Sequence, residues 1–243
     1  MIPQPDPSPP PTPHNPQPFF DYTDLLFFIG LCVPCLLIAV ALVRGAAHFI
    51  HTPAPAMLLL IQSVWYFLAF GSIAMLFRIR YREPFWHALG WRALSFSRSA
   101  GALLAGPLLA LALGILGAAL HTPEIDLPFQ QMLGNAATTI SLGIVVVILG
   151  PVCEELAFRG FLMPLLVRSL GAAGGIVLTG FIFGSIHGYE YEWSWRHMLL
   201  ISLVGCVFGW AKYKTQSTAA AALMHSTFNL TQFAAFLWRA GTL

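Results

Sequence analysis

Long apolar runs without charged side chains dominate the chain from residue 25 onward. Leu25–Val43 is one such run of 19 residues, and Pro55–Phe77 and Ala100–Leu120 are two others. An α-helix needs about 20 apolar residues to cross the hydrocarbon of a bilayer. These three runs therefore predict three transmembrane helices.

Four later runs mix apolar residues with small, hydroxyl or ionisable ones: Ala136–Cys153, Ala172–Ile186, Met198–Ala211 and Thr218–Trp238. Helices of this composition belong in the interior of a bundle, away from lipid. With the first three runs they give about seven spans. The predicted fold class is all-α: a polytopic membrane helix bundle.

Two segments of different composition accompany the spans. Residues 1–18 hold nine of the eighteen prolines and no Lys or Arg, which predicts a disordered or polyproline II tail over residues 1–22, before a single transmembrane domain over 23–243. In Arg78–Arg98, five arginines alternate with aromatic and leucine residues. We expect an interfacial amphipathic helix there, lying on the membrane surface.

Composition narrows the class of protein further. Hydrophobic residues make up 57% of the chain and charged residues 9%, against roughly a quarter charged in soluble domains, so a soluble globular protein is excluded. The net charge of +2 provides no excess of positive charge for a phosphate backbone, which argues against nucleic acid as a partner. The expected partner is the lipid bilayer.

Basic residues are distributed unequally between the two sides of the predicted bundle. The outer loop His121–Asn135 carries Glu124 and Asp126 and no Lys or Arg. Three basic residues fall on the same outer side as this loop. Nine fall on the inner side: Arg78, Arg80, Arg82, Arg92, Arg98, Arg159, Arg168, Lys212 and Lys214. The positive-inside rule then places the N-terminus in the cytoplasm. We expect a multi-pass protein of a prokaryotic-type plasma membrane.

Ionisable side chains occur at the end of the fourth apolar run of the chain, Ala136–Cys153. Glu154, Glu155 and Arg159 lie in sequence there, and insertion scales charge roughly 2.5–3.5 kcal/mol for one such group at a helix centre. Glu155 and Arg159 are four residues apart in the order that favours a same-face ion pair, while Glu154 is rotated away by about 100°. An ion pair that only fixes helix packing is the alternative interpretation.

Two later helices add imidazole and amide groups. Phe183 and His187 form F-x-x-x-H, and His225 and Asn229 form H-x-x-x-N, each pair sharing one helix face. A single buried histidine or asparagine is more often a packing residue. Two acids, an arginine, two histidines and an amide in consecutive apolar helices instead indicate a reaction site.

The ordered set E-E-x-x-x-R, F-x-x-x-H and H-x-x-x-N resembles the CAAX protease and bacteriocin-processing family, the Abi or type II CAAX prenyl endopeptidase-like group, over about Thr138 to Trp238. The resemblance implies an intramembrane endopeptidase and makes an eighth helix an option, if the segment after Arg159 is re-entrant. It implies Glu154 as general base on a water held with His187, Glu155 and Arg159 as supporting pair, and His225 and Asn229 as oxyanion donors. The implied partner is a peptide or protein substrate with a membrane-proximal cleavage site.

Several alternatives remain open at this point. No cofactor is favoured, but Glu154, His187 and His225 would be the ligands if the site held zinc. A non-catalytic immunity or scaffold protein of the same family, or a proton-coupled transporter, would also use buried acids. At 1.5 Å per residue, Glu154 and His187 reach one depth only if the helix that carries Glu154 is long and continues past Arg159 toward Arg168.

The basic asymmetry makes a topological prediction. With the four native cysteines replaced, a cysteine introduced at Gln130 should react with a membrane-impermeant maleimide on intact cells, and one at Ser8 should not. Both positions should react once the membrane is permeabilised. Labelling of the Ser8 site with protection of the Gln130 site would show the opposite orientation.

Overall fold

The structure is a computed structural model that describes residues 18–49, 54–125, 133 and 135–241. Over these residues all regular elements are helical, as predicted. The first half of the chain forms α1 (Tyr22–Ala47), α2 (Ala54–Arg80), the short α3 (Phe85–Ala88) and α4 (Phe96–Ala119). The chain ends with α8 (Trp195–Thr215) and α9 (Thr218–Arg239). Residues 1–17, which hold most of the predicted tail, lie outside the described residues.

A long central helix separates these two groups. It consists of α5 (Ala136–Ile144), the π-helix η2 (Val145–Leu149), α6 (Gly150–Glu155), the π-helix η3 (Leu156–Leu162) and the part of α7 (Met163–Ile186) that precedes Gly171. The helical backbone is interrupted at Gly171, where φ is 74°, and the chain then turns back so that Gly175 meets the backbone of Val167. The segment after Arg159 therefore continues the same helix to residue 170 and forms no separate re-entrant helix.

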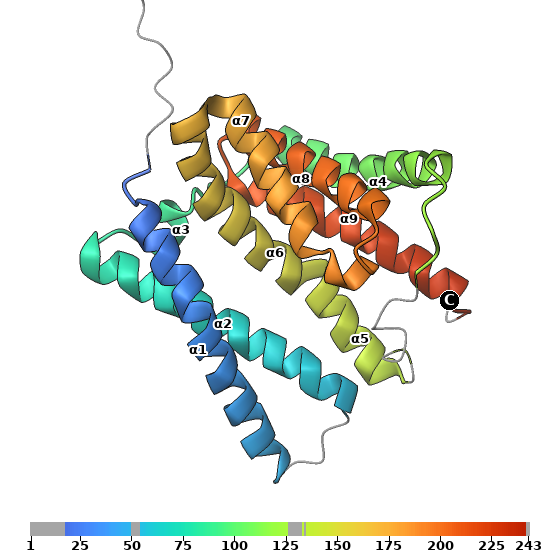
Figure 1. The fold of residues 1–243 in the computed structure, drawn as a ribbon, viewed down its shortest axis with the longest axis horizontal. Helices are drawn as coiled ribbons and strands as arrows, with labels where there is room; N and C mark the ends of the chain where they lie inside the picture. The colour runs from blue at the N-terminus through green and yellow to red at the C-terminus, as the bar shows by residue number, and fades with distance from the viewer. Residues whose placement is uncertain (1–17, 50–53, 126–132, 134, 242–243) are drawn as a thin grey trace, which may run out of the picture.

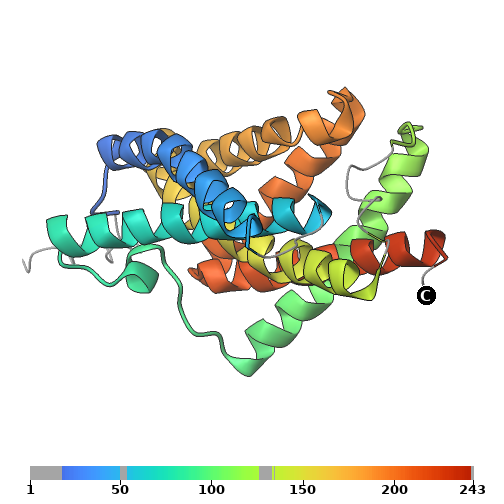
Figure 2. The same ribbon diagram turned by 90° about the horizontal axis from the view of Figure 1, so that it is seen from below.

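The central helix runs between two groups of helices (Figure 1). On one side α1 and α2 form a hairpin, which Figure 2 shows side by side. On the other side α7 packs along α8, α9 contacts α6 and η2, and α4 lies along α9. Phe28 of α1, Ile73 and Phe77 of α2 and Phe161 of η3 share one buried core, so the hairpin packs against the central helix.

Four helical segments are long and apolar enough to cross a membrane: Tyr22–Ala47, Ala56–Arg80, Phe96–Ala119 and Ala136–Ile186, the last containing the break at Gly171. The chain is thus an integral membrane protein. The two helices α8 and α9, predicted as spans, are formed but do not reach this apolarity among the described residues. In α9, His225 and Asn229 bond to the central helix, as polar residues of a bundle interior do.

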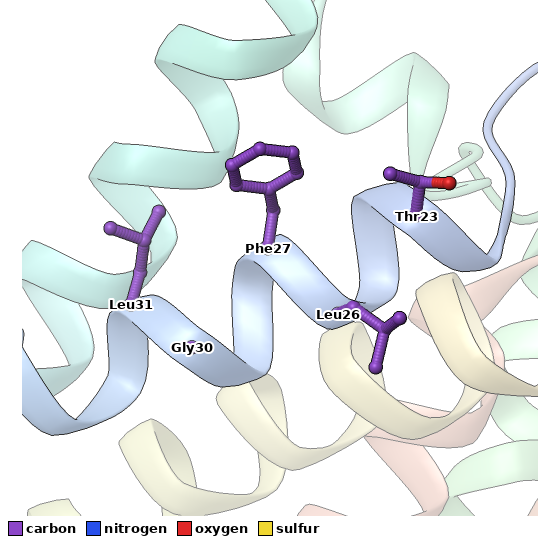
Figure 3. A pocket seen from close by; sticks show the side chains of 5 residues that line it. All are labelled: Thr23, Leu26, Phe27, Gly30 and Leu31. Atoms are coloured by element: carbon purple, nitrogen blue, oxygen red, sulfur yellow. The ribbon is translucent and has the colours of Figure 1, made fainter.

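The outer surface of α1 is apolar. Leu26 is 68% exposed, and with Thr23, Phe27, Gly30 and Leu31 it lines an open apolar hollow (Figure 3). A surface of this kind is compatible with lipid contact, because side chains exposed to acyl chains need no polar character. The hollow contains none of the candidate catalytic residues.

The segment Arg78–Arg98 is not one amphipathic helix, so that prediction is wrong. The helix α2 ends at Arg80, α3 covers four residues, and the chain then runs without helix to Ser95, the N-cap of α4. Pro84 lacks a backbone N–H and disfavours helical geometry at the residue before it. Gly90, at φ 67°, then takes the left-handed conformation that ends a helix.

Small residues bring α7 and α8 into close contact. A Cβ atom on Gly184 would overlap the hydroxyl of Ser202, and one on Gly205 would lie 2.9 Å from the Cα of Gly180. In a bundle within lipid, such small residues allow two helix backbones to approach. This approach positions the carbonyl of Gly205 beside the charged cluster described next.

Candidate active site

The buried carboxylate of Glu155 joins the central helix to α9. Its Oε1 accepts a hydrogen bond from Arg159 Nη1 at 2.8 Å and lies 2.9 Å from Nδ1 of His225, which is on α9. The side chains of Glu155 and Arg159 are fully buried, and that of His225 is 5% exposed. The predicted same-face pair is therefore formed, and it includes His225 as a third member.

Arg159 is held on all sides by the protein. Its Nη2 donates to the carbonyl of Gly205 on α8 at 2.7 Å, and its guanidinium lies 4.6 Å from the ring centroid of Phe183 and 5.5 Å from that of Phe208. Cation–π contact of this kind stabilises a desolvated guanidinium. Gly205 and Phe208 could not be recognised from the sequence, because neither a backbone carbonyl nor an apolar ring stands out in an apolar helix.

Glu154 differs from its neighbour in exposure and bonding. Its side chain is 26% exposed, and its Oε2 lies 4.0 Å from Nε2 of His225. No hydrogen bond to Glu154 occurs among the described residues, whereas Glu155 is already engaged by two partners. One acid of the pair is thus fixed, and the other remains accessible to water or a ligand.

His187 ends α7 and bonds within its own helix. Its Nδ1 lies 2.7 Å from the carbonyl oxygen of Phe183; because that oxygen only accepts, Nδ1 carries the proton and Nε2 is left for another partner. Within the described part of the chain no hydrogen bond joins His187 to Glu154. The ring of Phe183 contacts both histidines, with its centroid 4.7 Å from that of His187 and 5.9 Å from that of His225.

Asn229 binds the backbone of the central helix. Its Nδ2 donates to the carbonyl of Val146 at 2.9 Å. The N–H of Gly150 bonds the carbonyl of Val145 in the π-helix, and Pro151, the next residue, has no N–H to offer. Because a buried carbonyl without a donor is costly, Asn229 supplies the hydrogen bond that the backbone cannot.

Prolines end both π-helices. Pro151 follows η2, and in η3 the N–H of Met163 bonds the carbonyl of Phe158, with Pro164 as the next residue. A π-turn contains one extra residue, so the helix faces before and after it depart from the regular 3.6-residue repeat. The π-helix η3 begins directly after the Glu154–Glu155 dipeptide, and η2 ends at Leu149, before the short α6 that carries the dipeptide.

The alternative ligand set for zinc was Glu154, His187 and His225. Across the described residues, no group of three His, Cys, Asp or Glu side chains is arranged to hold a metal ion. His225 Nδ1 is engaged by Glu155, and His187 Nδ1 by its own helix. These side chains do not converge in the way that a three-ligand zinc site requires.

Comparison with known proteins supports the resemblance drawn from the motifs. Residues 135–231 match the family model described as Type II CAAX prenyl endopeptidase Rce1-like, which confirms that resemblance over a segment containing all six candidate residues. The matched family is a family of proteases. No curated protein and no solved structure matched the chain. Residues 1–134 lie outside the family match.

The buried network predicts how Arg159 contributes to stability. Arg159→Ala leaves the buried Glu155 without its guanidinium, and breaking such a pair costs about 3–5 kcal/mol. The melting temperature in detergent should therefore fall well below that of the wild type. Arg239→Ala, at an exposed position on α9, is the matched control and should melt like the wild type. Equal melting of the two variants would mean that the pair does not stabilise the fold.

Proposed function

We propose that the chain is an intramembrane endopeptidase in which Glu154 activates the attacking water without a metal. The observation that supports this most is the difference between the two adjacent acids. Glu155 is buried and bonded to Arg159 and His225, while Glu154 keeps an exposed edge beside His225. A general base needs an accessible carboxylate, and a neighbouring group that orients the site needs fixed bonds.

The reaction follows from these groups. Glu154 takes a proton from water, and the resulting hydroxide attacks the carbonyl carbon of the scissile bond. The C–N bond of the tetrahedral intermediate then breaks, and the proton on Glu154 passes to the departing amine. Nε2 of His187, which its own helix leaves free, is assigned to hold the water with Glu154.

The oxyanion of the intermediate needs hydrogen-bond donors. Asn229 donates one N–H to the carbonyl of Val146 and keeps a second one for this role. His225 donates from Nε2 when its ring is doubly protonated, since Nδ1 already donates to Glu155. With that imidazolium, the set of Glu154, Glu155, Arg159 and His225 is electrically neutral, which suits a low-dielectric interior.

The substrate class follows from the place of the site. Glu154 lies in a membrane-spanning helix, so the bond that is cleaved belongs to a peptide or protein that reaches the membrane. The name of the matched family points to CAAX prenyl peptides, and C-terminal lipidated peptides are therefore the first substrates to test. We place the N-terminus in the cytoplasm on the strength of the basic asymmetry.

Glu154→Gln tests the proposal. The variant keeps the size of the side chain but removes the base, so it should abolish cleavage of a quenched lipidated peptide in detergent. Its melting temperature should equal or slightly exceed that of the wild type, because a charged group that accepts no hydrogen bond among the described residues has been removed from an apolar helix. Full activity in this variant would rule out Glu154 as the base. An inactive wild type across several peptides would favour the non-catalytic immunity or scaffold alternative.

The metal-free assignment makes a separate prediction. Exhaustive treatment with a strong chelator should leave most of the peptidase activity of the purified protein intact. A zinc-dependent peptidase of known chelator sensitivity, assayed in the same detergent, is the control. Activity that disappears with the chelator and returns with zinc, at an unchanged melting temperature, would make the two histidines ligands.

A further inference from the structure

The buried face of α2 carries two polar residues at its middle. Leu59, Ala69, Ile73 and Phe77 are all less than 7% exposed, and successive members are ten, four and four residues apart. Residues at this spacing lie on one face of a helix. Gln62 and Tyr66 fall on the same face, between Leu59 and Ala69.

This face of α2 packs against the central helix with both helices running in the same direction. Leu59 shares a buried cluster with Leu142 and Val145, near the start of the central helix. Ile73 and Phe77 share another cluster with Leu156 and Phe161, further along it. The middle of α2 must therefore lie level with the segment between Val145 and Leu156, which contains Glu154.

The carboxylate of Glu154 reaches back along its own helix. A Cβ atom on Gly150 would lie 3.7 Å from Oε1 of Glu154, so this carboxylate lies near Gly150, within the segment between Val145 and Leu156. His225 approaches Glu154 from α9, with its Nε2 4.0 Å from Oε2.

The middle of α2 is less tightly covered than its ends. Gln62 and Tyr66 are partly exposed, although residues on the same face before and after them are buried. Glu154 is 26% exposed at the same level. Accessible surface therefore remains at the level that the polar residues of α2 share with the proposed base.

The hydrogen bonding of Tyr66 leaves its proton unused. Gln62 Nε2 donates to the Tyr66 hydroxyl at 3.1 Å, so the phenol oxygen acts as the acceptor, and among the described residues its own O–H has no acceptor. The ring stacks on Trp65, whose Nε1 donates to the carbonyl of Cys32 on α1. A donor fixed in this way beside hydrocarbon is costly unless it meets an acceptor.

We propose that Tyr66 donates a hydrogen bond to the carbonyl oxygen of the scissile bond as it becomes the oxyanion, with Gln62 as the positioning residue. This inference rests on the proposed function and adds a catalytic residue from α2, outside the segment that matches the family. A substrate would then be bound between α2 and the central helix, with Glu154 and Tyr66 on opposite sides of the reacting carbonyl. No bond beyond those of the hydrolysis forms or breaks.

Tyr66→Phe removes only the hydroxyl and is the direct test. Loss of one oxyanion donor costs about 10²–10³-fold in kcat, so kcat should fall by that order with KM and melting temperature unchanged. Tyr213→Phe on α8 is the matched control and should keep wild-type kinetics. Gln62→Met should lower kcat by a smaller factor, because the phenol remains but is no longer held.

A second readout separates transition-state contact from a structural effect. Two affinities should be compared with and without Tyr66→Phe. The first is for a peptide whose scissile carbonyl is replaced by a tetrahedral phosphonamidate, and the second is for the uncleaved peptide, measured in the inactive Glu154→Gln background. Tyr66→Phe should weaken the first affinity far more than the second. Wild-type kcat in Tyr66→Phe, a change in KM alone, or a loss matched by a lower melting temperature would each overturn the role of Tyr66. If Glu154→Gln remains active, the proposed function itself fails, independently of Tyr66.

Discussion

The shared carboxylate of Glu155 is the interaction on which the rest of the site depends. It binds a guanidinium from its own helix and an imidazole from α9, and the guanidinium in turn binds a backbone carbonyl on α8. A charged group in hydrocarbon is tolerated when it is paired and hydrogen-bonded. One oxygen of Glu155 and the Nε of Arg159 still lack partners within the described residues, so the network is incomplete. Its geometry nevertheless fixes three helices around the accessible Glu154.

Backbone irregularity gives the central helix its second property. A regular helix would satisfy the carbonyl of Val146 internally and leave the side chain of Asn229 without this bond. The π-helix that precedes Pro151 instead exposes that carbonyl to α9, and Asn229 binds it. The prolines that disturb the helix thus create a contact between α9 and the π-helix η2, which precedes the α6 segment that carries Glu154. Bulges of this kind are common at functional sites.

Helix spacing explains which parts of the site were predictable. Glu155 and Arg159 pair as expected, since positions four apart share a face in any helix. The central helix also continues past Arg159, as a common depth for Glu154 and His187 requires. The pairing of His225 with Glu155 and the bond from Asn229 to Val146 were not predictable, because they depend on how α9 packs and on π-turns that shift helix faces.

In Arg78–Arg98 the apolar pattern favoured one helix, but Pro84 and Gly90 ended it locally. Tyr66 had a signal, a polar position on a buried stripe, which the apolarity of α2 concealed.

The central claim is that adjacent acids have different roles because only Glu155 is bonded to Arg159 and His225. Thermal unfolding of Glu155→Gln and Glu154→Gln, purified in one detergent, tests it most directly. We expect a clearly lower melting temperature for Glu155→Gln, because the variant removes the negative charge that pairs with Arg159 and His225. We expect no such decrease for Glu154→Gln. A destabilised Glu154→Gln beside a Glu155→Gln that melts like the wild type would contradict it and exchange the two roles.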